Sequence, residues 1–170
     1  DSIKEDFLLL GEILFGDYNR IVNDQMLHSC TNYECYKGLY SSFNDLNLFE
    51  ISYSLNRQFG KEGSAIYKGK HLMSFADNHD VSRILKDQKH LPLLYGLLFA
   101  MPGIPCIYYG SEWGILGAKD NTGDDALRPE LSAPDWNGLT TLISDCAALH
   151  KQYKSLIYGD YRSVVLTNRQ

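Results

Sequence analysis

The stretch that most constrains the fold is residues 72–80, where a short apolar run ends abruptly in four polar residues. Residues 72–76 are mostly apolar, over a length typical of a buried strand. The polar residues that follow are Asp77, Asn78, His79 and Asp80. In α/β folds, catalytic and binding residues lie at the carboxyl ends of buried parallel strands. The pattern therefore predicts an α/β fold with a site at the end of this strand.

A purely structural interpretation of the same four residues is also open. A polar turn of this composition could begin a helix, with Asp80 or Ser82 as the N-cap residue. We expect residues 81–87 to start a helical region that continues or restarts through residues 90–101, where a Pro-Gly pair ends it. On the composition of this stretch alone, a site and a helix cap are equally acceptable.

Two other stretches have the same design and favour the site. Residues 7–10 predict a strand that is followed by Gly and Glu12, and a strand predicted at residues 104–109 is soon followed by Glu112. Three strands that each lead to an acid predict one common rim rather than three unrelated turns. We interpret Glu112 as a hydrogen-bonding residue of this rim.

The rest of the chain alternates strand and helix signals, which predicts parallel strands joined by right-handed crossovers. The other expected elements are a weak strand at 26–33, a loop at 38–44, a helix from 45 or 47 to about 59, a long loop at 114–137, a helix at 139–153 and an isolated strand at 161–167. The long loop is rich in Gly, Asp and Pro, as functional loops often are. In it, Arg128 could anchor the loop through an ion pair with Asp124 or Asp125, with substrate contact as the lesser alternative.

Composition limits the class of protein. The 170 residues are enough for one sizeable core, and 44% hydrophobic and 22% charged residues are ordinary for a globular protein. A net charge of −5 without a basic cluster argues against nucleic-acid binding. The longest apolar stretch, residues 91–101, is too short to span a membrane. Four scattered cysteines predict free buried thiols in a reducing compartment, so we expect a cytoplasmic protein with neither nucleic-acid nor membrane partners.

Three segments together resemble the α-amylase superfamily of glycoside hydrolases. Residues 75–80, Phe-Ala-Asp-Asn-His-Asp, are similar to the F-x-x-N-H-D stretch on the seventh barrel strand of that family. Residues 101–114 are similar to the P-G-I-P-x-I-Y-Y-G-x-E-x-G run of its eighth strand, and residues 10–12 resemble the end of its fifth. The order of the three segments along the chain, with about two βα units between Glu12 and Asp80, makes the combined resemblance specific.

The resemblance implies a (β/α)8 barrel followed by a β-sandwich domain. On this mapping, residues 1–157 supply the C-terminal half of the catalytic barrel, with strands five to eight. Residues 158–170 would begin a truncated C-terminal β domain. A full TIM barrel takes about 250 residues, so we expect a partial one. Unpaired strand edges and exposed apolar inner faces of a half-barrel predict a homo-oligomer.

The resemblance also implies roles for four residues. Glu12 corresponds to the general acid/base and Asp80 to the carboxylate that stabilises the transition state. His79 and, less directly, Asn78 would bind hydroxyl groups of the substrate, an α-glucan oligosaccharide. The nucleophilic aspartate of the family lies on the fourth strand, which would precede Asp1, so we expect the chain alone to be inactive.

Several alternatives stay open. An α-glucan transglycosylase or isomerase of the same superfamily would use the same residues, and a non-catalytic half-barrel would act only through association. Aromatic residues near the rim could stack on sugars, although packing roles are favoured for Tyr33, Tyr109 and Trp113. No cofactor is expected. No metal site is expected either, because His79 and Asp80 lack a third and a fourth ligand at a suitable spacing.

Overall fold

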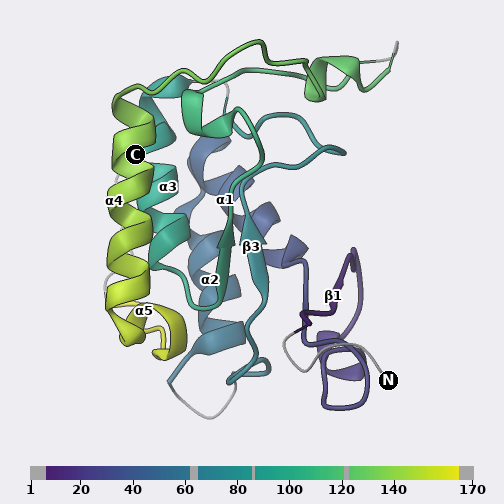
Figure 1. Cartoon of the computed structure of the whole chain (residues 1–170). Helices are drawn as coiled ribbons and strands as arrows, with labels where there is room; N and C mark the ends of the chain where they lie inside the picture. The colour runs from purple at the N-terminus through teal and green to yellow at the C-terminus, as the bar shows by residue number, and fades with distance from the viewer. Residues whose placement is uncertain (1–6, 62–64, 86, 121–122, 165–170) are drawn as a thin grey trace.

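The computed structural model describes residues 7–61, 65–85, 87–120 and 123–164, and its centre is a set of four short parallel strands (Figure 1). Strand β1 (Leu10–Gly11) pairs with β2 (Ser29–Cys30), and β3 (Met73–Phe75) pairs with β4 (Ile104–Cys106). A parallel bridge between Thr31 and Met73 joins the two pairs. The strands therefore follow one another across the structure in chain order, as successive βα units produce.

Helices cover one side of these strands. They are α1 (Tyr33–Asn44), α2 (Leu48–Phe59), α3 (Leu91–Ala100), α4 (Gly138–Gln152) and α5 (Lys154–Tyr158), with 3-10 turns η1 (Tyr18–Arg20), η2 (Gln88–His90), η3 (Ser111–Trp113) and η4 (Asp125–Leu127). In Figure 1, α2, α3 and α4 lie on one side of β3, and β1 lies on the other. The core lies between strands and helices, and its fully buried side chains include Leu39, Leu55, Leu72, Leu94 and Leu98.

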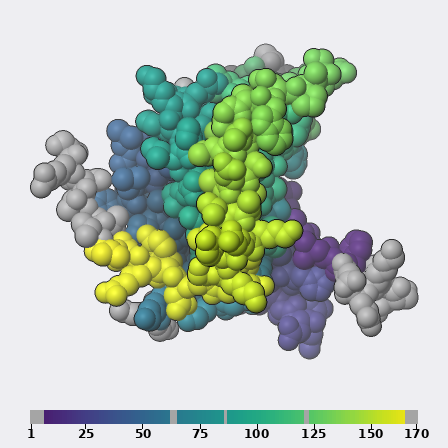
Figure 2. Space-filling model, turned by 60° about the vertical axis from the view of Figure 1, so that its left-hand side comes forward, coloured from purple at the N-terminus to yellow at the C-terminus, as the bar shows by residue number. Residues whose placement is uncertain are grey.

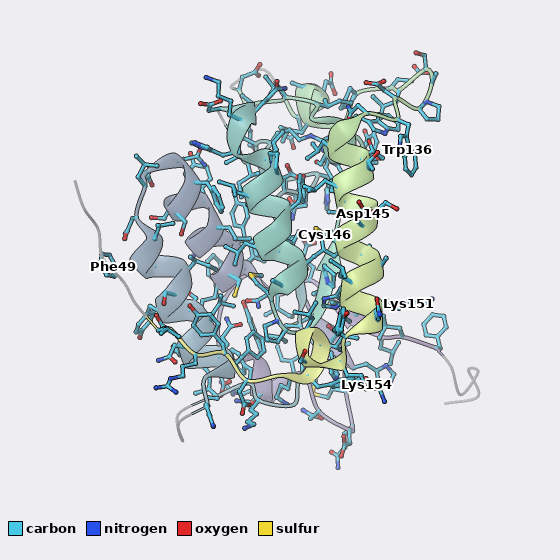
Figure 3. The ribbon with its side chains drawn as sticks, turned by 90° about the vertical axis from the view of Figure 1, so that its left-hand side faces the viewer. Phe49, Trp136, Asp145, Cys146, Lys151 and Lys154 are labelled. Carbon is cyan, nitrogen blue, oxygen red and sulfur yellow. The ribbon has the colours of Figure 1, made fainter. Side chains whose placement is uncertain are left out.

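Helix α4 forms the outer layer and packs on α3. Figure 2 shows α4 running across the surface of the molecule. In Figure 3, Cys146 lies between the two helices, whereas Asp145 and Lys151 lie on the outer side of α4. Asn137 caps this helix by accepting hydrogen bonds from the amides of Leu139 and Thr140. No helix among the described residues is long and apolar enough to cross a membrane.

Several sequence predictions are confirmed. The helix expected to end near residue 59 is α2, which ends at Gly60, and the helix expected at 139–153 is α4. Four of the predicted strands exist but are shorter than expected, at two or three residues each. The helix end predicted from the Pro-Gly pair at residues 102–103 is confirmed, because α3 ends at Ala100. Gly103 has φ +105°, and a Cβ there would lie 2.5 Å from the Leu72 carbonyl oxygen.

The loop predicted at residues 38–44 is wrong, because this segment belongs to α1. Glycine, serine and asparagine have low helix propensity, which suggested a loop. Tertiary packing decides otherwise. A Cβ at Gly38 would lie 2.8 Å from the Ile51 Cα, so glycine lets α1 and α2 approach closely. Ser42, also buried, donates its hydroxyl hydrogen to the Gly38 carbonyl oxygen.

The helical start predicted at residues 81–87 is also wrong, and helix α3 begins only at Leu91. Two of the described backbone amides of this segment bond outside it instead of forming helical hydrogen bonds. The Arg83 amide donates to the Gly117 carbonyl oxygen, and the Ile84 amide donates to the Asp77 carboxylate. These tertiary hydrogen bonds replace the local ones that a helix would form.

The isolated strand predicted at residues 161–167 is described only in part. Tyr161 forms a single parallel bridge to Gly60, and residues 162–164 form no strand. Residues 165–167 of the predicted strand lie outside the described residues. The Tyr161 amide donates to the Phe59 carbonyl oxygen, so this end of the chain lies against the end of α2.

Candidate active site

The folded chain brings together three of the four predicted site residues from two separate segments. Glu12 directly follows β1, and His79 and Asp80 follow β3 by a few residues. One oxygen or nitrogen ligand atom from each of these three side chains lies within 4.8 Å of the others. All three are solvent-exposed. Two carboxylates and an imidazole therefore converge at the carboxyl ends of the strands, where the sequence pattern placed a rim.

The fourth predicted residue, Asn78, joins the group through a buried tyrosine. The Tyr33 hydroxyl donates to Glu12 Oε1 at 3.0 Å and accepts from Asn78 Nδ2 at 2.9 Å. Burial raises the pKa of Tyr33, so the phenol keeps its proton at neutral pH. The tyrosine therefore fixes the carboxylate of Glu12 relative to the polar stretch after β3.

The side chain of Asn78 also shapes the turn that carries Asp80. Its Oδ1 accepts hydrogen bonds from the amides of Asp80, at 2.9 Å, and Val81, at 3.2 Å. Local bonds of this kind are common for Asn in turns. The N-cap interpretation of Asp80 and Ser82 is therefore wrong. No helix starts here, and the Ser82 hydroxyl instead accepts the Lys119 amide hydrogen.

Asp80 interacts with two basic side chains. Its Oδ1 lies 3.4 Å from His79 Nε2 and 3.2 Å from Arg128 Nη2. Arg128 also lies 3.5 Å from Asp124, which confirms the ion pair expected to anchor the long loop. The contact between Arg128 and Asp80 was not foreseen, because nothing in the sequence links residues 48 positions apart.

The three converging side chains offer donor atoms of a kind that metal ions bind. Glu12 supplies the third ligand that sequence spacing alone did not indicate. Arg128 already occupies the Asp80 carboxylate, however, and its positive charge opposes a cation at the same oxygen. The arrangement is therefore better suited to holding a polar, uncharged ligand than a metal ion.

A cavity of about 310 Å³ opens beside the converged residues. This volume is within the range of small-ligand sites. Its walls combine apolar strand residues with the polar rim: Leu10, Gly11, Glu12, Thr31, Met73, Phe75, Asp77, Asn78, His79, Cys106, Ile107 and Tyr108. The cavity thus connects the open side of the strands to three of the four predicted site residues.

Two other rim residues differ from expectation. The Glu112 Oε2 atom is buried and has no hydrogen-bond partner among the described residues, so the expected rim hydrogen bond does not form at that atom. The sequence interpretation gave Tyr33 only packing or stacking, and its bridging hydroxyl was missed. The weak polar end of the strand predicted at residues 26–33 was the only local signal for it.

A family profile described as "Alpha amylase, catalytic domain" matches residues 1–152. The fold and the rim are those of an α/β protein whose polar site lies at the carboxyl ends of parallel strands. The chain belongs to the α-amylase family of glycoside hydrolases, as the sequence resemblance implied. This assignment covers most of the described structure, including every residue of the converged group.

Curated relatives have related names. An intracellular maltogenic amylase of Bacillus subtilis is 29% identical over 126 residues, which are 69% of this chain and 20% of that protein. A cyclomaltodextrinase of Geobacillus thermopakistaniensis is 25% identical over 173 residues, covering 94% of this chain and 27% of that protein. The chain therefore spans between a fifth and about a quarter of the length of these relatives.

Solved structures confirm the α/β fold. The cyclomaltodextrin glucanotransferase CldA superposes with a TM-score of 0.76 at 25% identity, covering 92% of this chain and 34% of that chain. A cyclic α-maltosyl-(1→6)-maltose hydrolase from Arthrobacter globiformis gives 0.72 at 22% identity, covering 96% and 38%. The assignment of β1 to β4 as strands five to eight of a barrel stays a prediction.

Proposed function

We propose that this chain forms the acid/base part of a retaining α-amylase-type active site that cleaves α-glucosidic bonds in starch, maltodextrin or related oligosaccharides. The observation that carries the proposal is the convergence of Glu12, His79 and Asp80 within 4.8 Å, beside a cavity that Glu12 and His79 line. Retaining glycosidases use a general acid and a carboxylate nucleophile, through a transition state of oxocarbenium character. The convergence brings two carboxyl groups, those of Glu12 and Asp80, to one place.

In the proposed reaction, Glu12 protonates the glycosidic oxygen as the bond to the leaving sugar breaks and the nucleophilic carboxylate bonds to the anomeric carbon. Glu12 then takes a proton from the water that releases the second product. The Tyr33 hydroxyl holds the Glu12 carboxylate in place. Asp80 stabilises the developing positive charge on the sugar ring. His79 and Asn78 bind hydroxyl groups, and the nucleophile is proposed to come from a strand outside residues 1–170.

The relatives support this substrate class. Their names describe maltogenic amylase and cyclomaltodextrinase activities. On the same basis we propose a cytoplasmic location, since one relative is named intracellular. A transglycosylase is the second candidate, favoured by the structural similarity to a cyclomaltodextrin glucanotransferase. The two candidates share every proposed residue and differ only in whether water or a sugar accepts the glycosyl group.

The test compares carboxylate variants in the protein as its gene encodes it. We expect Glu12→Gln to lower kcat for maltopentaose by about 10²–10⁴-fold, because the acid cannot donate a proton. Glu50→Gln is the matched control, since Glu50 is an exposed carboxylate on α2. Product analysis by chromatography separates hydrolysis from transfer. Unchanged turnover in Glu12→Gln would remove Glu12 from the acid role.

The 170-residue chain on its own is expected to show no turnover. Binding of maltotriose, followed by NMR chemical shifts of the rim amides, separates a missing nucleophile from a missing binding site. Turnover by the chain alone that disappears in Glu12→Gln would show that a nucleophile lies within residues 1–170.

A further inference from the structure

A buried polar network lies directly behind the rim, and the reaction proposed above does not use it. Asp77, Arg83 and Ser111 are only 4%, 6% and 3% exposed. The Ser111 hydroxyl donates to Asp77 Oδ1 at 2.8 Å and accepts from Arg83 Nη1 at 2.7 Å. An acid and a base are thus joined through a serine inside the protein. Buried charges are costly unless they are paired and hydrogen-bonded in this way.

Arg83 connects three segments of the rim. Its Nη2 donates to the Leu127 carbonyl oxygen at 3.3 Å, and its backbone amide donates to the Gly117 carbonyl oxygen at 2.8 Å. Its guanidinium also lies over the Tyr108 ring, 4.3 Å from the centroid. One side chain therefore holds the stretch after β3, the stretch after β4 and the long loop against one another.

Two residues of this network, Asp77 and Leu127, are adjacent in sequence to residues of the site. Asp77 immediately precedes Asn78, whose side chain shapes the turn that carries Asp80. Leu127 immediately precedes Arg128, which forms the ion pair with Asp80. The Asp80–Arg128 pair is exposed at the surface, and exposed pairs are weak by themselves. The buried groups behind the pair hold the two segments that carry it.

We propose that Arg83 is a positioning residue that sets the placement of the Asp80 carboxylate relative to Arg128 and Glu12. This inference rests on the proposed function. The planar guanidinium reaches Ser111 and Leu127 at the same time from different nitrogens and stacks on Tyr108. A lysine has one ammonium nitrogen on a flexible chain and cannot reproduce that geometry. Without the Arg83 guanidinium, the segments that contain Ser111 and Leu127 can move independently of each other.

The test uses Arg83→Lys, which keeps the charge, and Arg83→Met, which keeps a long side chain without donors. His150→Gln is the control for a general loss of stability. His150 is buried and contacts the carbonyl oxygens of Phe99 and Gly103, just before β4 and at the opposite end of that strand from Ser111. Amide hydrogen exchange on the full chain is the first measurement and requires no activity.

In Arg83→Lys and Arg83→Met we expect the amides of Asp80 and Val81 to exchange at least about tenfold faster, while amides of β3 stay protected, because only local opening becomes easier. In His150→Gln the Asp80 and Val81 amides are expected to keep their exchange relative to β3. Equal acceleration of rim and β3 amides in the Arg83 variants would mean a purely structural role and would overturn the proposal, as would no acceleration at all.

The second measurement is kinetic and uses maltopentaose with the protein as its gene encodes it. We expect Arg83→Lys to lower kcat and kcat/KM together by about 10²-fold, since misplaced catalytic groups act on the transition state. A rise in KM alone would contradict positioning. If the unmodified protein shows no turnover, the proposed function fails, and the exchange experiment still decides whether Arg83 orders the rim.

Discussion

At the scale of single residues, the site depends on buried groups that hold exposed ones. Tyr33 is 5% exposed and bonds to both Glu12 and Asn78. Its hydroxyl can donate only one hydrogen, which goes to the carboxylate, while it accepts from the amide. The exposed acid thereby gains a fixed orientation that solvent alone would not give it. Buried residues of this kind set the positions of the exposed residues to which we assign the chemistry.

Tyr33→Phe isolates this contribution. We expect kcat for maltopentaose to fall about tenfold in the protein as its gene encodes it, because the hydrogen bond that orients the Glu12 carboxyl group is lost. Thermal unfolding should change little, since the ring and its packing on Phe75 remain. Tyr36→Phe is the control, because Tyr36 also packs on Phe75. A kcat in Tyr33→Phe equal to that of Tyr36→Phe would contradict a role in orienting Glu12.

The buried carboxyl of Asp77 gives a prediction for pH. Burial raises its pKa above the ordinary value of 3.8, more than the hydrogen bonds from Ser111 and Ile84 and the nearby Arg83 lower it. At pH values between 3.8 and the pKa of Asp77 in the native state, the native state therefore binds more protons than the unfolded state. Its contribution to stability is full below that window and is lost as the pH rises through it.

Asp77→Asn tests this directly. Urea unfolding of both proteins over a pH series should show the stability of the natural chain falling relative to the variant as the pH rises through the window, because asparagine does not titrate. A difference between the two unfolding free energies that is constant with pH would show that Asp77 has the same pKa folded and unfolded.

At the scale of elements, a fully buried pair of amides joins two helices to a strand. Asn32 Nδ2 donates to Gln58 Oε1 at 2.8 Å, and Gln58 Nε2 donates back to Asn32 Oδ1 at 3.0 Å. Asn32 Oδ1 also accepts from the Cys35 amide and so caps α1, and its Nδ2 reaches Ser74 of β3 at 3.3 Å. One side chain therefore fixes the start of α1 against both α2 and β3.

Asn32→Ala should destabilise the chain by about 2–4 kcal/mol, because it removes a helix cap and leaves the Gln58 amide buried without its partner. The free energy of unfolding from a denaturant titration measures this. Asn23→Ala is the control, since Asn23 is exposed and bonds only locally. An effect as small as that of the control would mean that the amide pair does not fix these elements.

At the scale of the whole molecule, the strands have an open edge and an open side. Within the described residues, β1 pairs only with β2. Around it, large apolar side chains are exposed: Phe7, Leu8, Leu9, Leu10, Leu14 and Phe15. Exposed edges and apolar patches of this kind drive association. We therefore keep the prediction of a homodimer or larger assembly for the isolated chain, formed through these edges.

Sedimentation at micromolar concentration measures this state. Leu8 is 55% exposed, and Leu8→Lys should shift the chain toward monomer, because a lysine at an edge opposes pairing with a second strand. Leu149→Lys is the matched control, since Leu149 is 47% exposed on α4, and Figure 1 shows α3 and β3 between α4 and β1. A monodisperse monomer of the unmodified chain would contradict association.

The boundary between the two expected domains belongs to the same scale. We propose that residues 1–157 are barrel and that residues 158–170 begin a β domain. Tyr161 is partly buried against the core and bridges Gly60. This contact would place the start of the second domain against the end of α2.

The sequence by itself determined the class of fold and the identity of the proposed acids. The apolar run at residues 72–76, followed directly by polar residues, indicated a buried strand that leads to a site, and that pattern is local in the chain. Helices with a clear period and a glycine stop, such as α2, were predictable for the same reason. Secondary-structure preferences of this kind depend on residues that are close together in the chain, so a single sequence can show them.

Only the tertiary structure decided which distant groups meet. Residues 38–44 became helix because Gly38 packs on Ile51, and residues 81–85 stayed irregular because their amides bond across the rim. The contacts of Arg128 with Asp80, and of Arg83 with Ser111 and Leu127, join residues that are 28 to 48 positions apart. Such contacts depend on the free energy of the whole packed arrangement, which no local pattern contains.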